Sequence, residues 1–173
     1  MKQTFKKTRR IRWLFLIVTL SAIFSCTSYF TYKGQEVAEA DRIEIKEGGP
    51  YTGSWDTRDL SLDYVYEQKK DSFTLSGKVT FNKHIIYNFR LLDYFDLRVH
   101  FVDGSGKIIE GKGIVSSGHH VEIENLPFKK QFALPSGAVA MVFSYSGRAS
   151  ELGDEAGRTD YEFWESPVRR RIF

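Results

Sequence analysis

Apolar and polar residues alternate along most of the chain after residue 50. Apolar side chains recur at every second position in four stretches, at residues 60–66, 73–81, 85–89 and 95–101. Alternation with a period of two predicts strands that bury one face and expose the other to solvent. We expect a bend at Asn82-Lys83, before the third of these strands.

Turn-forming residues separate the predicted strands. The charged QKKDS stretch at 68–72 predicts a hairpin loop between the first two. The stretch Asp103-Gly104-Ser105-Gly106 favours the positive φ angles of a tight hairpin, so residues 107–116 are expected to return antiparallel. Within this returning strand, Gly111 and Gly113 predict a bulge.

Three further strands are predicted at 121–126, 139–145 and 161–164. The second is strongly apolar, so we expect it to be central in its sheet and to end at Gly147. Short strands separated by turns, without a long helical pattern, indicate an all-β sandwich or barrel. We expect a single antiparallel β-sandwich, immunoglobulin-like or transthyretin-like, with an eight-stranded barrel around a ligand cavity as the alternative.

Composition agrees with a sheet protein and argues against a nucleic-acid partner. The chain has 14 Phe, 9 Tyr and 3 Trp among 173 residues, and aromatic residues favour strands. Its formal net charge is +3, but six of the 25 basic residues lie within the first 25 positions. The remainder therefore carries a net charge of −3, and no basic surface for nucleic acid is expected.

The first 26 residues have the three parts of a secretory signal peptide. Positions 2–12 carry six Lys or Arg and no acidic residue, and the stretch from Trp13 to Phe24 is uncharged and mostly apolar. Ser25 then places a small side chain before Cys26. This order is typical of a secretory signal, whose cationic part stays on the cytoplasmic side. Residues 1–25 are therefore predicted to be a signal peptide.

The stretch Ile23-Phe24-Ser25-Cys26 resembles the lipobox of bacterial lipoproteins, an aliphatic residue, a small residue and Gly, Ala or Ser before an invariant Cys. Ile23, Ser25 and Cys26 match, whereas Phe24 is bulkier than usual. The resemblance implies diacylglyceryl transfer to the sulfur of Cys26, cleavage between Ser25 and Cys26, and acylation of the new amino group, for instance by palmitate. Thr27 rather than Asp follows, which in a Gram-negative lipoprotein implies export to the outer membrane. Cys26 is the only cysteine, so no disulfide within the chain competes for it.

Two other interpretations of the N-terminal stretch remain open. The uncharged run from Trp13 to Phe30 has eighteen residues, close to the roughly 20 that span a bilayer, so it could be an uncleaved signal anchor. Alternatively, the signal is cleaved in the ordinary way and Cys26 is incidental. All three interpretations place the following domain outside the cytoplasm.

The rest of the chain divides into three predicted parts. Residues 26–49 are polar, mixed in charge and end in two glycines, which predicts a flexible tether with a helical turn at 36–40 and an edge strand at 42–46. Residues 50–167 form the predicted sandwich. Residues 168–173 (VRRRIF) form a basic segment. We expect this segment to be solvated, with contact to anionic lipid headgroups or an acidic partner as the alternative.

Residues 73–109 contain FTLSGKVTF, then FDLRVHFVDGSGKII. This stretch resembles extracytoplasmic β-sandwich modules of the FxLYD type, which have a strand with glycine, a paired strand and an Asp-x-x-Gly-Lys hairpin. The resemblance implies the same sandwich class in the same compartment.

Histidines are the first candidates for chemistry. His119 and His120 would point to opposite faces if they lay on a strand. In a loop they could bind one metal ion, with Glu122 or Glu124 nearby, but the spacing matches no zinc motif. We therefore expect exposed histidines, no metal and no cofactor. His84 and His100 are isolated, and His100 is predicted on the solvent face of its strand.

No nucleophile or phosphate-binding motif stands out in the sequence. Gly-x-Ser-x-Gly and P-loop patterns are absent, and Ser105 belongs to the predicted hairpin. Four carboxylates that could act in pairs or bind calcium are expected to be solvated: Asp93, Asp96, Asp154 and Glu155. Four aromatic residues could stack on sugars or on a partner, although core packing is expected for most: Trp55, Tyr94, Tyr145 and Trp164.

The sequence therefore predicts a lipid-anchored, extracytoplasmic β-sandwich at the cell membrane or outer membrane. We expect a non-catalytic binding or structural module of the cell envelope, held by lipid on Cys26 and contacting an envelope protein. The alternative is an anchored small-molecule or carbohydrate-binding protein, or a hydrolase that uses the loop around His119, His120 and Glu122.

Overall fold

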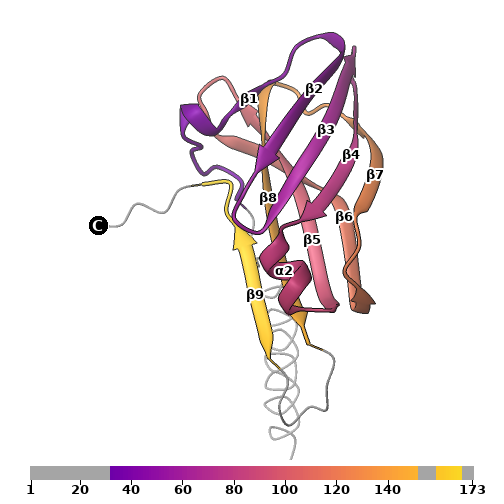
Figure 1. The fold of residues 1–173 in the computed structure, drawn as a ribbon. Coiled ribbons are helices and arrows are strands. Elements are labelled where there is room, and N and C mark those ends of the chain that lie inside the picture. Colours follow the sequence, from indigo (N-terminus) through magenta and orange to yellow (C-terminus); the bar gives the residue numbers. More distant parts are fainter. Residues whose placement is uncertain (1–31, 152–158, 169–173) are drawn as a thin grey trace, which may run out of the picture. The chain divides into compact units, whose positions relative to one another are not determined.

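The computed structural model describes residues 32–151 and 159–168 (Figure 1). The predicted signal peptide with its Ser25–Cys26 cleavage site, the carboxylates Asp154 and Glu155, and most of the basic segment lie outside the described residues. The compact unit that contains the sheets begins at Tyr32. Among the described residues, no helix has the length and apolar character that a membrane crossing requires.

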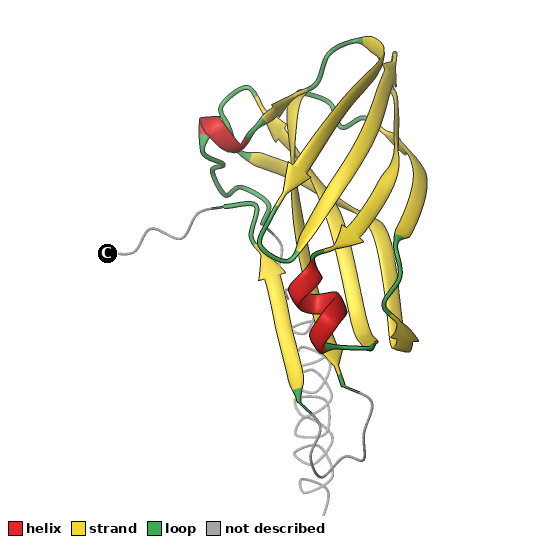
Figure 2. Cartoon of the chain, in the orientation of Figure 1, coloured by secondary structure: helices red, strands yellow, loops and turns green. Residues whose placement is uncertain are grey.

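Two antiparallel sheets make up the described fold, which confirms the predicted all-β sandwich (Figures 1 and 2). The five-stranded sheet has the order β1-β8-β5-β6, with β9 also paired to β8. Its strands are β1 (Ile43–Glu44), β5 (Leu91–Asp103), β6 (Ile108–Glu122), β8 (Ala138–Ser150) and β9 (Asp160–Glu165). The four-stranded sheet has the order β2-β3-β4-β7. Its strands are β2 (Gly48–Asp56), β3 (Leu60–Lys69), β4 (Ser72–Phe81) and β7 (Leu126–Ala133).

Both predicted hairpins are present. Lys69 pairs with Ser72, so the β3–β4 turn needs only Lys70 and Asp71. In the β5–β6 turn, Oδ1 of Asp103 accepts hydrogen bonds from the backbone N–H groups of Ser105 (2.8 Å) and Lys107 (3.0 Å). The hydrogen bond from the Ser105 hydroxyl to the same oxygen, followed by these backbone bonds, holds the pKa of the Asp103 carboxyl below its ordinary value.

The strand β8 is central, as predicted, with β5 along one edge and β1 and β9 along the other. It does not end at Gly147 but continues to Ser150. A Cβ at Gly147 would collide with the ring of Phe163 on β9. The glycine therefore permits close packing of two paired strands, which local turn chemistry does not reveal.

Two strand predictions were wrong. Residues 85–89 do not form a strand, because Lys83–Asn88 is the short helix α2. Ile85 and Phe89 are both buried, and their spacing of four residues puts them on one helical face as readily as on one strand face. The predicted strand 121–126 is divided: β6 continues to Glu122, and β7 begins at Leu126.

The predicted bulge in β6 is present. The register shifts between the pairs Leu97–Val115 and Arg98–Gly113, which leaves Ile114 as the additional residue. Ile114 is buried. The bulge therefore redirects an apolar side chain into the core.

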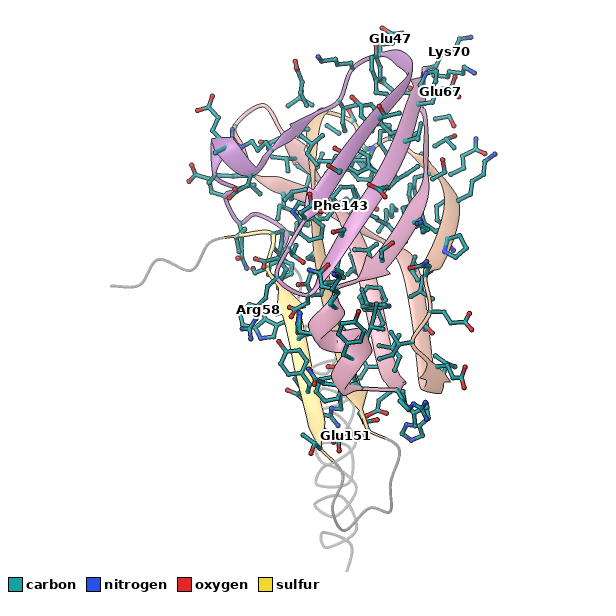
Figure 3. All side chains as sticks on the ribbon, in the orientation of Figure 1. Glu47, Arg58, Glu67, Lys70, Phe143 and Glu151 are labelled. Atoms are coloured by element: carbon teal, nitrogen blue, oxygen red, sulfur yellow. The ribbon has the colours of Figure 1, made fainter. Side chains whose placement is uncertain are left out.

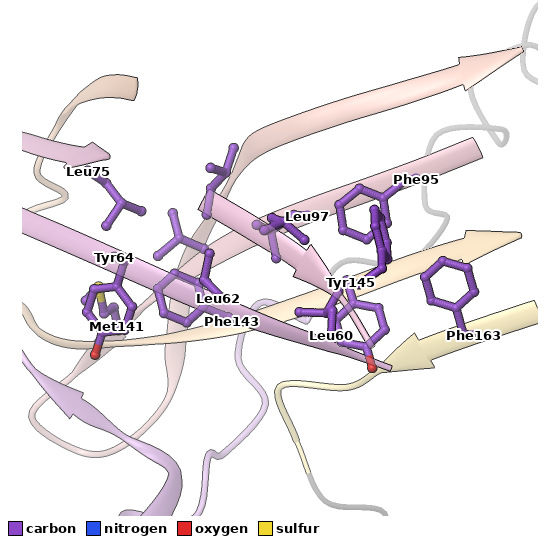
Figure 4. Close-up of a cluster of buried hydrophobic side chains, with 14 of the residues drawn as sticks. Leu60, Leu62, Tyr64, Leu75, Phe95, Leu97, Met141, Phe143, Tyr145 and Phe163 are labelled. Atoms are coloured by element: carbon purple, nitrogen blue, oxygen red, sulfur yellow. The ribbon is translucent and has the colours of Figure 1, made fainter. Parts of the chain in front are cut away.

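The main core fills the space between the sheets with aromatic and aliphatic side chains (Figure 4). Tyr64 from the four-stranded sheet meets Phe143 from the five-stranded sheet at a ring-centroid distance of 5.2 Å. Phe81 and Phe95 make a similar cross-sheet contact in edge-to-face geometry, also at 5.2 Å. Such pairs add to the area-based stabilisation of a core.

A second apolar cluster lies on the opposite, outer face of the five-stranded sheet. Its buried members are Val37, Val102, Ile108, Ala140 and Val142, with Tyr32 and Val168 packed against them. We call this group the outer cluster. It forms because the chain from Tyr32 onward covers one end of that face.

The described part of the predicted tether therefore lies against the sandwich. The backbone N–H of Gly34 donates to the carbonyl of Ile108 (2.7 Å), and that of Val37 donates to the carbonyl of Gly106 (2.9 Å). The helical turn expected at 36–40 appears as the 3-10 turn η2 (Glu39–Asp41), and β1 lies within the expected edge strand. Burial of Val37 and Ile43 outweighs the polar composition of this segment.

Candidate functional site

A buried carboxylate, Asp59, lies between the two sheets near α2. Its Oδ2 accepts a hydrogen bond from the hydroxyl of Tyr145 on β8 (2.9 Å). Its Oδ1 accepts one from the hydroxyl of Tyr161 on β9 (3.0 Å) and lies 3.1 Å from Nε2 of His84 on α2. We call these four side chains the Asp59 network. It joins the entry of β3 to α2 and to two strands of the other sheet.

The chain around Asp59 is fixed by a compact turn before β3. The backbone N–H of Thr57 donates to the carbonyl of Leu60 (2.9 Å), and the Thr57 hydroxyl donates to the same carbonyl (2.9 Å). The side-chain amide of Asn82 donates to the carbonyls of Thr57 (3.0 Å) and Arg58 (2.9 Å). Figure 3 shows Arg58 beside β9, at the α2 end of the sandwich. These bonds hold the turn so that the Asp59 carboxylate meets the hydroxyls of Tyr145 on β8 and Tyr161 on β9.

Burial and the Asp59 charge raise the pKa of three groups around this carboxylate. Burial, followed by the neighbouring Asp59 charge, raises the pKa of Tyr145, although its contact with Thr57 acts in the opposite direction. Burial and the hydrogen bond to Asp59 also raise the pKa of Tyr161. The pKa of Glu165 is raised by burial and then by the Asp59 charge. Because both phenols remain donors, the carboxylate is occupied by protein groups, an arrangement suited to holding strands together.

His100 is buried, which corrects the prediction that it lies on a solvent face. Its Nε2 is 2.7 Å from Oγ of Ser144 on the neighbouring strand. The ring of Tyr32 meets the imidazole edge-on at 5.3 Å. Burial, and then the positive charge of Arg98, lower the pKa of His100 to about 4. The residue is on the outer face, as alternation requires, but the chain from Tyr32 covers that face.

The predicted loop around His119 and His120 is not a loop, because both residues belong to β6, near the end of its pairing with β5. Nδ1 of His120 is 2.6 Å from Oδ1 of Asp93, and the Ser150 hydroxyl donates to the same oxygen (2.8 Å). Glu122 is paired in register with Leu91, at the end of β6. In a nucleophilic triad the imidazole lies between hydroxyl and carboxylate, whereas here the carboxylate lies between the other two. Ser150 is also fully buried, so its hydroxyl is not presented to a substrate.

The described residues contain no cluster of side chains that could form a metal centre. No three His, Cys, Asp or Glu side chains within residues 32–151 and 159–168 are grouped closely enough to hold an ion. The His119 side chain lies outside what the structure describes.

An open hollow of about 450 Å³ lies beside α2. Phe81 at the end of β4, Ile86 of α2 and Ile123 after β6 form its apolar walls, with Glu124 and Asn125 at its polar side. Sequence reasoning missed it because it assigned residues 85–89 to a strand. The walls come from three elements far apart in the chain, so no local pattern signals their meeting.

The structure separates the four aromatic candidates into two groups. Tyr145 is buried in the Asp59 network, and Trp55 packs against Phe143 at 5.6 Å. Tyr94 and Trp164 remain 41% and 54% exposed. Their register places both on the outer face of the five-stranded sheet, on β5 and β9. They therefore belong to a surface away from the main core.

Charged partners flank the exposed Tyr94. The Arg148 guanidinium lies 5.9 Å from the centre of the Tyr94 ring and forms an ion pair with Glu162. Asp96, one of the carboxylates expected to be solvated, forms an ion pair with Arg98 at 3.4 Å. This part of the outer face is thus amphipathic, with aromatic faces beside paired charges, a composition common at recognition surfaces.

Comparison with known proteins assigns no family. Neither a protein-family model nor a curated protein nor a solved structure matches the chain.

Proposed function

We propose that this chain is a lipid-anchored, extracytoplasmic β-sandwich that serves as a non-catalytic binding or structural module of the cell envelope. The observation that carries the proposal is the spacing between the predicted lipid site and the fold. Cys26 ends a signal-like stretch, and the compact unit begins at Tyr32, with only five residues between the two. A folded domain directly after a lipidated cysteine is held at the membrane surface.

The lipid supplies attachment and confinement. A diacylglyceryl thioether on Cys26, together with an acyl chain such as palmitate on its amino group, supplies several acyl chains. Several chains make the attachment durable, because a single chain holds a protein at a membrane only weakly. Confinement to the plane of a membrane raises the effective concentration of the domain toward an envelope partner without any new contact. A module of this kind acts by position and surface recognition.

The polar groups of the sandwich support a non-catalytic role. The Asp59 carboxylate is occupied by two phenol donors and lies beside His84. In the other cluster, Asp93 lies between His120 and a buried serine. Both arrangements connect strands, and neither positions an accessible nucleophile beside a base.

Intact-mass measurement of the full chain after membrane extraction tests the anchor. We expect a mature chain that starts at Cys26 and carries added acyl mass. The control variant Cys26→Ser should lose that mass and accumulate as the uncleaved precursor. Full-length, unmodified protein from Met1 would overturn the proposal in favour of a signal anchor. A cleaved chain without acyl mass would overturn it in favour of ordinary secretion.

A second candidate is a lipid-anchored protein that binds a small apolar ligand, favoured by the hollow beside α2. Binding of the neutral probe Nile red, followed by its fluorescence, tests this function. Ile86→Lys places a charge in the hollow and should abolish the signal. Val139→Lys is a matched control, because Val139 is 48% exposed compared with 46% for Ile86 and lies outside the hollow. Equal signals from both variants and the unmodified chain would eliminate this candidate.

A further inference from the structure

We propose that the outer face of the five-stranded sheet binds an uncharged oligosaccharide chain at the point where β9, β8 and β5 lie side by side (Figure 1). This site rests on the proposed role of the domain as a binding module and names the chemistry that such a module would recognise. Six side chains on these three strands form the site, which we call the outer platform: Tyr94, Asp96, Ser146, Arg148, Glu162 and Trp164.

One row of the outer platform crosses the sheet at Arg148. This residue is paired in register with Tyr94 on β5 and with Glu162 on β9. Its guanidinium lies 5.9 Å from the centre of the Tyr94 ring and forms an ion pair with Glu162. The row faces outward, because successive side chains of a strand point to opposite faces and the adjacent ones are buried in the main core. These adjacent residues include Phe95, Ala149 and Phe163.

The second row places a small side chain between two larger ones. Ser146 is paired in register with Asp96 on β5 and with Trp164 on β9. The backbones of Tyr94 and Trp164 are two strands apart and offset by two residues, which corresponds to about 12 Å. Both rings are exposed, so one extended ligand that lies across Ser146 can contact the two of them.

The charges of this face favour a ligand that both donates and accepts hydrogen bonds. Arg148 is paired with Glu162. Asp96 is paired with Arg98, so the charges of the two ion pairs cancel. A carboxylate only accepts hydrogen bonds and a guanidinium only donates them, whereas a hydroxyl group does both. Uncharged sugars carry many hydroxyl groups, and their C–H faces suit the electron-rich face of an aromatic ring.

One hydrogen-bond donor of the outer platform is unsatisfied. Among the buried side-chain nitrogen and oxygen atoms of residues 32–151 and 159–168, only Nε of Arg148 has no hydrogen-bond partner. Such atoms are rare in folded proteins, because a buried donor without an acceptor is unfavourable. The guanidinium therefore has hydrogen-bonding capacity that Glu162 does not use, and a ligand hydroxyl beside the Tyr94 ring would supply an acceptor.

Other classes of ligand fit these residues less well. A nucleic acid or an anionic membrane requires an excess of basic residues, but here each arginine has an acidic partner. A wholly apolar ligand would cover the charged groups without offering them hydrogen bonds. Small molecules are usually enclosed in a pocket, whereas the hollow beside α2 includes no residue of the outer platform. An extended polar chain lying on the sheet is the better match.

Isothermal titration calorimetry of the full chain tests this site. The protein is extracted in a zwitterionic detergent, because detergents with sugar headgroups would compete with the ligand. The probes are cellotetraose and chitotetraose, which are uncharged and have extended, β-linked backbones. We expect at least one of them to bind. Raising the salt to about 1 M, where the Debye length is roughly 3 Å, should change the affinity less than about twofold, because the ligand has no charge.

Matched variants locate the binding. Tyr94→Ala and Trp164→Ala should each weaken it about tenfold, the effect expected for the loss of one stacked ring. Tyr87→Ala is the control and should bind like the unmodified chain, because Tyr87 is also exposed but lies on α2. Trp164→Phe keeps an aromatic ring and should retain most of the affinity. Circular dichroism checks that each variant is folded.

Three results would overturn the proposed sugar site. These are the absence of binding to both probes, an affinity that collapses in salt, and an unchanged affinity in the folded variants Tyr94→Ala and Trp164→Ala. A contact surface for a protein would then be the better explanation of the exposed rings.

Intact mass of the same preparation distinguishes failure of this site from failure of the proposed anchor. If Cys26 is acylated and neither probe binds, the sugar site is wrong and the anchored module stands. If a probe binds and Cys26 is not acylated, the anchor is wrong and the sugar site stands. Ile86→Lys should leave sugar binding unchanged, because Ile86 lines the hollow and not the outer platform.

Discussion

The hydroxyl of Tyr145 donates a hydrogen bond of 2.9 Å to the buried carboxylate of Asp59, across the interface between the two sheets. Tyr145 lies on β8, and Asp59 immediately precedes β3. With Tyr161 and His84 at the other carboxylate oxygen, this bond closes the α2 end of the sandwich by a polar contact in place of an apolar one.

Replacing Asp59 with Asn should destabilise the fold considerably. The variant removes the charge that the buried Tyr145 hydroxyl and the partly buried Tyr161 and His84 side chains face, so we expect a loss of about 2–4 kcal/mol in the free energy of unfolding. Urea denaturation monitored by circular dichroism measures it. Asp56→Asn is the control, because Asp56 is exposed nearby and should change stability by less than about 0.5 kcal/mol. Similar midpoints for the two variants would show that the Asp59 network contributes little.

Removing only the phenol oxygen of Tyr145 should have a smaller effect. Tyr145→Phe keeps the ring in the core but deletes its contacts with Asp59 and Thr57, with an expected loss of about 1–2 kcal/mol. A double-mutant cycle with Asp59→Asn should give a non-additive result, because the two groups interact directly. Tyr87→Phe, at an exposed position of α2, serves as the reference substitution. Strict additivity in the cycle would contradict a direct contact.

Stability should fall between pH 6.5 and 4 because of His100. Its pKa in the folded protein is about 4, below its ordinary value of 6.5. The unfolded chain therefore takes up a proton that the folded chain does not, and this stabilising contribution is complete above pH 6.5. It is lost as the pH falls toward 4, by up to about 3 kcal/mol.

The variant His100→Gln isolates that contribution from the carboxylates that also titrate in acid. Unfolding free energies measured across the range should show a flatter dependence for the variant than for the unmodified chain. Parallel curves would mean that His100 does not have the depressed pKa.

A methyl group at Gly111 should be costly, whereas one at Gly113 should not. A Cβ at Gly111 would lie 2.7 Å from Nδ1 of the buried His100, while a Cβ at Gly113 meets nothing within 4 Å. We expect Gly111→Ala to lose about 1–3 kcal/mol and Gly113→Ala to stay within about 0.5 kcal/mol. Thermal unfolding of both variants measures the difference, and equal melting temperatures would refute the close approach.

Much of the fold was predictable because strand pairing leaves a local trace. Alternation over residues 60–66 and 73–81, with a polar loop between them, predicted β3 and β4. The residue types at 103–106 predicted the β5–β6 turn. These features depend on a side-chain period of two and on backbone angles within a few residues. They can therefore be predicted without knowing which strands pair.

What covers a strand face is not local, and here the sequence misled. Alternation put His100 on the outer face, but the burial of that face depends on a segment almost seventy residues earlier, beginning at Tyr32. The strand predicted at residues 85–89 was wrong for a similar reason, because α2 forms there instead. Ile85 and Phe89 fit either period over so short a stretch, and only packing against the core selects the helix.

The sequence by itself determined the class of fold, the principal hairpins and a signal-like N-terminal stretch ending at the only cysteine. The tertiary structure alone decided the Asp59 network, whose contacts join residues up to 102 positions apart. It also decided that Tyr32 and Val168 share one patch. Local patterns encode which side of a strand is apolar, whereas the meeting of distant polar groups depends on how whole sheets pack, where burial and hydrogen bonding are satisfied together.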